Sequence, residues 1–174
     1  EKPKPYGMLT DYITGKEVPN IGAEENRQQV ERFLVEKKGY DRGDIEVDAD
    51  LTFSLHDEEV HSSVDLVVSV SGKRFMVLRC VPGSFVSRQR ETLAAARLLD
   101  DYQVPFSVVT DGKDAALLDT VTGAVLDQDM NAIPSKEEAV QDMKEVALQP
   151  FPQEKLERGR KEGREDQADR ELAE

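Results

Sequence analysis

The stretch that decides the fold runs from Val64 to Val81 and reads V-D-L-V-V-S-V-S-G-K-R-F-M-V-L-R-C-V. It contains two apolar, β-branched runs joined by Ser71-Gly72-Lys73, which predicts paired strands over 64–71 and 74–81. Near the start of the first run, Asp65 places a carboxylate in a segment that otherwise favours burial. A charge in such a strand is costly unless it is paired or functional, so Asp65 is the first candidate functional residue.

The segments on either side alternate between helical and strand patterns. Apolar residues at helical spacing predict helices over 23–38 and 85–102. Strict alternation from Ile45 to Leu55 predicts a half-buried strand near a sheet edge, and residues 56–63 are expected to form a polar loop. Short apolar runs predict further strands at 105–110, 115–120 and 124–126. The resulting order, α-β-β-β-α-β-β-β, predicts an α/β fold in which helices flank a mixed central sheet.

The two ends of the chain differ in composition from its middle. Residues 1–22 are rich in Pro and Gly and are expected to form an extended lead-in, followed by a core domain over 23–133. A charged helical extension is expected over 134–174. Within it, Ser135 is the predicted N-cap of a helix that reaches Leu148, because a Glu stands three residues after the Ser.

The composition excludes several classes of function. The chain has 174 residues, enough for one domain, and its 36 acidic against 23 basic residues give a formal charge of −13. This charge opposes binding to phosphate backbones, so DNA binding is expected to be weak or absent. The single cysteine, Cys80, excludes an internal disulfide and a Cys-based zinc site. Without a signal peptide or an apolar run of ~20 residues, the expected location is the cytoplasm, away from membranes.

Two other groups of residues are possible sites. His56 and His61 flank three acids and could suggest a loop metal site, but nothing fixes their geometry and a solvated turn is the expectation. The acids of residues 44–59, which lack any Lys or Arg between them, are expected to form a solvated strand face, with binding of a cation or a basic partner as the alternative. Cys80 is expected to point into the core, opposite Arg79, with no nucleophilic role.

The order of elements, with an acid on the second strand of the core, resembles the αβββαβ core of PD-(D/E)XK nucleases. More narrowly, residues 11–130 resemble the N-terminal domain of the R subunit of type I restriction enzymes and its stand-alone relatives. The matching motifs are D-Y-I-T-G-K-E-V-P at 11–19, E-E-N-R-Q at 24–28, K-G-Y at 38–40, V-D-L-V-V-S-V-S-G-K at 64–73, V-V-T-D-G at 108–112 and D-T-V-T-G at 119–123.

The resemblance implies roles for particular residues. The metal-binding acid of the family falls on Asp65, whereas the Glu-x-Lys of the third strand is replaced by Arg79 and Val81. Related nucleases often carry a Gln and, four residues later, a Tyr in the next helix; Gln89 fits the first position, but a Leu occupies the second. An acid of the first helix reaches the pocket in some of these nucleases, and Glu24 is the candidate here.

These replacements favour a catalytically degenerate module that serves as a structural or protein-interaction domain, with an unidentified protein partner and no cofactor. Arg79 cannot ligate a cation, and Val81 cannot orient water. We expect the Arg79 guanidinium to fill the space of the metal and to pair with Asp65. The alternative is an active nuclease that holds Mg²⁺ or Mn²⁺ at Asp65 and whose missing groups have moved elsewhere, for instance to Glu24.

Overall fold

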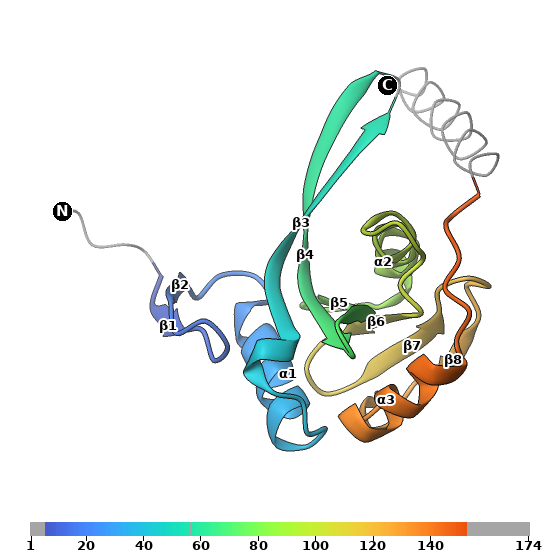
Figure 1. Ribbon diagram of the computed structural model, residues 1–174. Coiled ribbons are helices and arrows are strands. Elements are labelled where there is room, and N and C mark those ends of the chain that lie inside the picture. Colours follow the sequence, from blue (N-terminus) through green and yellow to red (C-terminus); the bar gives the residue numbers. More distant parts are fainter. Residues whose placement is uncertain (1–5, 56, 153–174) are drawn as a thin grey trace.

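The computed structural model describes residues 6–55 and 57–152, which form a six-stranded mixed sheet with helices on both faces (Figure 1). The strands, in their order across the sheet, are β3 (Ile45–Leu55), β4 (Glu58–Val70), β5 (Lys73–Cys80), β6 (Phe106–Thr110), β7 (Ala115–Asp119) and β8 (Val125–Asp127). The helices are α1 (Glu24–Glu36), α2 (Val86–Leu98) and α3 (Lys136–Glu145). The predicted α/β architecture is therefore confirmed.

Neighbouring strands are antiparallel except β5 and β6, which are parallel. A parallel pair needs a crossover connection, and α2 provides it. The sheet separates two apolar clusters. Val30 and Leu34 of α1 pack with Leu66 and Leu78 on one face, and Ala95 of α2 packs with other core residues on the opposite face.

The central hairpin forms as predicted, with Leu66 opposite Leu78, but β4 begins six residues earlier than expected. Residues 58–63 were predicted to lie in a polar loop, and this prediction is wrong. They pair with β3 as far as Leu55 opposite Glu58, and the two strands project beyond the body of the domain as an arm (Figure 1). Backbone pairing does not require apolar side chains, so the polar sequence concealed this strand.

The three helices end earlier in the sequence than predicted. Helix α1 ends at Glu36, because Gly39 has a positive φ of 78° and the N–H of Tyr40 donates to the Leu34 carbonyl, a common helix stop. Helix α2 ends at Leu98 and α3 at Glu145, each before its predicted limit. The charged segment 153–174 lies outside the described residues.

The lead-in is not a single extended segment. It contains a small antiparallel hairpin of β1 (Met8–Thr10) and β2 (Glu17–Pro19), which stands beside α1 and apart from the main sheet (Figure 1). The turn between the two strands begins at Asp11, whose backbone N–H donates to the Lys16 carbonyl at 2.7 Å.

The regular alternation of β3 is interrupted at Asp48, which has a φ of 53°. Val47 packs in the cluster on the α1 face, whereas Ala49 packs in the cluster on the α2 face. The same change occurs in β4, where Val64 belongs to the α2 face and Leu66 to the α1 face. The unbroken alternation predicted for β3 is therefore wrong. A positive φ at a non-glycine residue changes the face to which the following side chains of the strand point. In β3 this change occurs at Asp48, and in β4 the corresponding change occurs at Asp65.

Candidate functional site

Asp65 lies in a pocket of about 300 Å³ between α1, the β1–β2 hairpin and the middle of the sheet. The residues that line the pocket are Val18, Pro19, Ile21, Ala23, Glu24, Arg27, Asp48, Asp65 and Cys80. Two of them, Asp65 and Glu24, were candidates from the sequence. The pocket is therefore the place where the chemistry predicted for this fold would occur.

The carboxylate of Asp65 is bound by the backbone of the adjacent strand. Its Oδ2 accepts a hydrogen bond of 2.8 Å from the N–H of Cys80. Burial raises the pKa of Asp65, whereas this hydrogen bond and the charges of Arg79 and Arg27 act in the opposite direction. The acid is thus held by the protein itself, in a site that disfavours its charged form.

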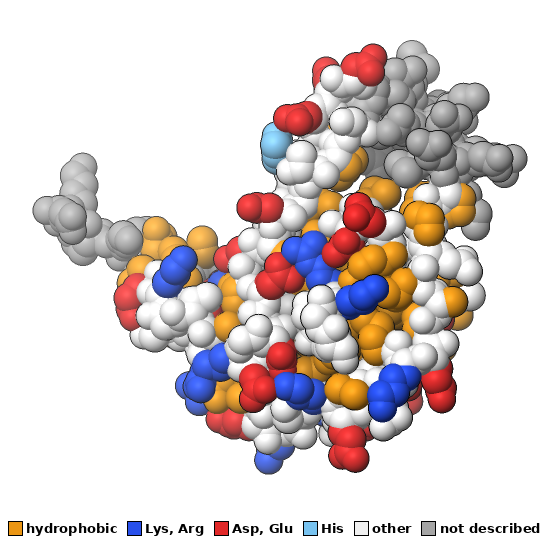
Figure 2. All heavy atoms as spheres, in the orientation of Figure 1, with side chains coloured by type: hydrophobic (Ala, Val, Ile, Leu, Met, Phe, Trp, Pro, Cys, Tyr) orange, Lys and Arg blue, Asp and Glu red, His pale blue; other side chains and the backbone are white. Residues whose placement is uncertain are grey.

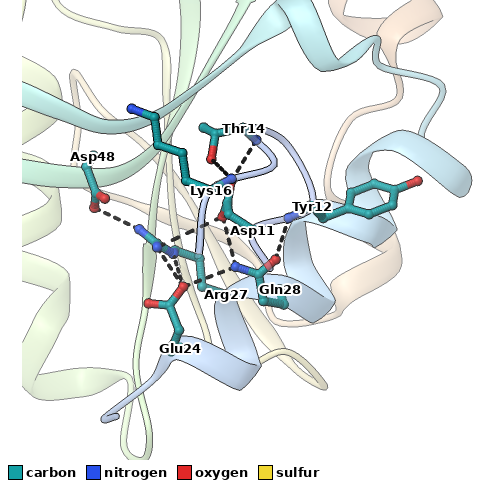
Figure 3. Close-up of polar contacts among 8 residues, drawn as sticks. All are labelled: Asp11, Tyr12, Thr14, Lys16, Glu24, Arg27, Gln28 and Asp48. Atoms are coloured by element: carbon teal, nitrogen blue, oxygen red, sulfur yellow. Dashed lines mark hydrogen bonds and ion pairs between the residues drawn. The ribbon is translucent and has the colours of Figure 1, made fainter. Parts of the chain in front are cut away.

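The cation of the pocket is Arg27 of α1, whose side chain is only 7% exposed. Its Nη1 lies 2.7 Å from Asp48 Oδ1, and its Nη2 and Nε lie 2.6 and 3.0 Å from Glu24 Oε1 (Figure 3). Burial alone would lower the pKa of Arg27, but Glu24 and Asp48 raise it overall. A permanent positive charge therefore lies among the acids of this pocket.

The predicted pair of Arg79 with Asp65 is not formed. Within the described part of the chain, no ion pair joins the two residues; Arg79 Nη2 lies 3.3 Å from Glu91 Oε1 of α2. Arg79 lines a different pocket, of about 190 Å³, together with Ala95 on the α2 face of the sheet. Successive residues of a strand point to opposite faces, and in β5 it is Cys80 that shares the face of Asp65.

The other described candidates from the sequence lie away from the pocket or are structural, and His56 lies outside the described residues. Val81 is buried, and its backbone N–H donates to the Thr110 carbonyl at 2.8 Å, which extends the pairing of β5 with β6. Gln89 lies in α2 and does not line the pocket of Asp65. His61 is exposed, 3.5 Å from Glu59, and the described residues contain no group of three His, Cys, Asp or Glu side chains suited to a metal.

The face of Asp65 also decides which residues of β5 could complete a metal site. Leu78 and Cys80 both pack in the cluster on the α1 face, and Cys80 also lines the pocket, so these residues of β5, rather than Arg79, lie on the side of Asp65. Leu78 offers no ligand. Burial raises the pKa of the Cys80 thiol, which keeps it neutral, and Arg27 would repel a divalent cation. The residues present therefore do not fit the metal that the fold implies.

Sequence reasoning missed Arg27 and Asp48. Arg27 stands in the E-E-N-R-Q motif, one helical turn after Glu24, and that spacing is the only signal that connects it to the pocket. Asp48 looked like one more outward residue of an alternating strand, because only the backbone irregularity directs it toward Arg27.

The six-stranded mixed sheet flanked by helices is consistent with a nuclease-like α/β fold. The chain belongs to the family described as type I restriction enzyme R protein N terminus, which matches residues 22–134. A solved structure with the same fold is the fragment of a putative HsdR subunit of a type I restriction enzyme from Vibrio vulnificus YJ016. It is 12% identical with a TM-score of 0.53, and the similarity covers 71% of this chain and 25% of the other.

A comparison with curated proteins finds no match. In the part of the chain that the structure describes, no helix has the length and apolar character needed to cross a membrane.

Proposed function

We propose that this chain is a catalytically degenerate member of its family, which serves as a structural or protein-interaction domain. The observation that carries the proposal is the composition of the Asp65 pocket. From β5, only Cys80 lines the pocket among the described residues, Leu78 is buried in the cluster on the same face, and the nearby cation is the chain's own Arg27. Metal-dependent cleavage requires oxygen ligands and a group that activates water, and neither is supplied by β5 on this face.

The partner that we propose is a protein, because the charge of the chain is unsuited to nucleic acid. Acidic side chains are prominent along the β3–β4 arm, and Asp50, Asp57, Glu58 and Glu59 are all exposed (Figure 2). The family name refers to the R protein of type I restriction enzymes, so association with the other parts of such an assembly is the form of interaction that we infer.

An active metal-dependent nuclease with relocated residues is the second candidate. One observation favours it: Glu24, Asp48 and Asp65 line the same pocket, although as they stand these three carboxylates do not form a group that could hold a metal. This reading requires Arg27 to leave its pairs with Glu24 and Asp48, at 2.6 and 2.7 Å, before a cation could enter.

Calorimetric titration of the full chain with Mn²⁺ separates the two candidates. The degenerate domain should give no saturable heat, and the Asp65→Asn variant should behave identically. Saturable binding that is lost in Asp65→Asn would favour the nuclease. A pull-down from the native cell, compared with a variant in which the acids of the arm are neutralised, then tests the proposed protein partner.

A further inference from the structure

The β1–β2 hairpin forms one wall of the Asp65 pocket. Val18 and Pro19 of β2, together with Ile21, line the pocket on the side opposite Cys80 of the sheet. The family model matches residues 22–134, which follow the hairpin directly. Gly22, with a φ of 60°, lies between the hairpin and α1 and is a natural hinge.

Several polar contacts fasten the hairpin to α1, and one residue among them, Asp11, is a buried carboxylate. Asp11, in the turn after β1, is 1% exposed; its Oδ1 accepts from Gln28 Nε2 and its Oδ2 from the Thr14 N–H, both at 2.8 Å (Figure 3). The Tyr12 N–H donates to Gln28 Oε1 at 2.7 Å, which completes a two-way bridge between the turn and the helix.

Close to this bridge, Glu31 of α1 is fully buried at 0% exposure. As a carboxylate it would have no hydrogen-bond donor among the described residues, because neither of its oxygens has a partner. As a carboxylic acid it can donate its proton to the Asp11 carboxylate, and this contact accounts for both groups. A buried polar group needs a partner, and a proton held between the two carboxyl groups would give Glu31 the partner that it otherwise lacks.

The groups that face Glu31 come from three elements. They are Asp11 from the hairpin turn, Glu24 and Arg27 from α1, and Cys80 from β5. Burial is the main cause that raises the pKa of Glu31 to about 9, and Asp11 and Glu24 add to it. Arg27 opposes the shift, but its guanidinium is already engaged by Glu24 and Asp48.

We propose that the β1–β2 hairpin is a lid on the Asp65 pocket, held closed by the proton shared between Glu31 and Asp11 and released when that proton is lost. The lid controls access to the pocket whether or not the pocket has any catalytic activity. When the hairpin lifts, Glu31 gains water and can ionise without facing a second buried carboxylate.

The direction of the pH effect follows from linkage. Glu31 has a pKa of about 9 with the lid closed and near its ordinary value of 4.5 when water reaches it. The closed state binds the proton more tightly, so closure is strongest below pH 4.5. Opening then becomes about tenfold easier with each pH unit up to about 9, and does not change further above that value.

Cys80 provides the readout, because it is the only cysteine of the chain, lines the pocket and is 7% exposed. The rate of its reaction with N-ethylmaleimide is measured from pH 6 to pH 8 in the full chain and in Glu31→Gln. The amide that Glu31→Gln introduces donates to Asp11 at every pH. An ionised Glu31 also raises the pKa of the Cys80 thiol, which would slow labelling of the unmodified chain relative to the variant, opposite to the effect of opening. The ratio of the wild-type rate to the variant rate should rise at least tenfold over this range. A constant ratio would overturn the proposal.

A second pair of variants tests the latch without changing the pH. Asp11→Ala removes the acceptor for Gln28 and Thr14, and should speed labelling of Cys80 at pH 6 at least tenfold in a protein whose circular dichroism is unchanged. Glu17→Gln, an exposed change on the same hairpin, is the control and should leave the rate as it is. Equal protection in all three proteins would contradict a lid. Because Glu31→Gln preserves the bridge, the pH comparison stands even where Asp11→Ala does not fold.

Discussion

The backbone N–H of Cys80 donates a 2.8 Å hydrogen bond to Oδ2 of Asp65, so the strand next to the acid holds it with its main chain. In a metal-dependent site of this fold, the adjacent strand would contribute side chains instead. This contact gives a carboxylate in the middle of the sheet a hydrogen-bond partner from the protein itself. It gives Asp65 a structural role that does not depend on catalysis.

Replacing Asp65 tests that role. Asp65→Ala leaves the Cys80 N–H without an acceptor and should lower the free energy of unfolding by about 2 kcal/mol, the usual cost of a buried unpaired donor. Asp65→Asn keeps an oxygen in place and should cost well under half of that. Urea unfolding followed by circular dichroism gives both values. Equal losses in the two variants would show that charge, rather than the hydrogen bond, is what the site requires.

Arg27 and Arg79 can be compared directly, because the sequence and the structure assign the pocket cation differently. Arg27→Ala leaves the Glu24 carboxylate, which is 16% exposed, without its cation, whereas Asp48, which is 60% exposed, stays hydrated; the free energy of unfolding should fall by about 2 kcal/mol. Arg79→Ala frees Glu91, which is 48% exposed, and should cost about 1 kcal/mol or less. Thermal or urea unfolding decides the order, and a larger loss for Arg79→Ala would contradict the assignment.

The pH dependence of stability reports on Glu31. Because the pKa of Glu31 is raised to about 9, the protonated side chain contributes fully to the free energy of unfolding below pH 4.5, and this contribution is lost as the pH rises toward 9. Relative to Glu31→Gln, the free energy of unfolding of the unmodified chain should fall by up to about 1.4 kcal/mol per pH unit between pH 5 and pH 9. Urea unfolding of both proteins at four pH values measures this difference. If the free energy of unfolding of the two proteins changed with pH in the same way, Glu31 would be ionised in the folded protein.

Much of the fold could be predicted from the sequence, for identifiable reasons. The two β-branched runs of 64–81 specify their hairpin, and the spacing of Ala95 and Leu98 specifies α2, because burial imposes the period. The first half of β4 escaped prediction, since Glu58 to Ser63 pair through their backbone and bury little. The β1–β2 hairpin was not predicted either, because its two short strands also pair through the backbone and bury few side chains.

The site was harder to predict because it depends on which way a strand faces. The side chains of adjacent strand residues point to opposite faces of the sheet. An error of one position in the predicted facing therefore puts Arg79 in the pocket where the structure has Cys80. The sequence contains the acid and a compensating Arg, but it does not say that the Arg comes from α1. The positive φ of Asp48, which directs its carboxylate toward Arg27, has no signature in an alternating strand.

Two double variants test the assignment of faces on β5. Leu78→Glu with Cys80→Lys places a family-like Glu-x-Lys on the side of Asp65, and should create saturable Mn²⁺ binding in the fraction that folds when Arg27→Gln is added to both double variants to remove the cation of the pocket. Arg79→Glu with Val81→Lys restores the Glu-x-Lys pair at the positions that the sequence alone suggests. It puts the Glu on the α2 face and should bind no Mn²⁺. Calorimetry after a circular dichroism check distinguishes them. Binding by the second variant alone would reverse the assignment.

The central claim is that the Asp65 pocket does not support metal-dependent cleavage, and the most direct measurement is conversion of supercoiled plasmid in Mn²⁺ by the full chain and by Asp65→Asn. The account predicts no nicking above the buffer control and no difference between the two proteins. Nicking by the unmodified chain that disappears in Asp65→Asn and in the presence of a chelator would contradict it.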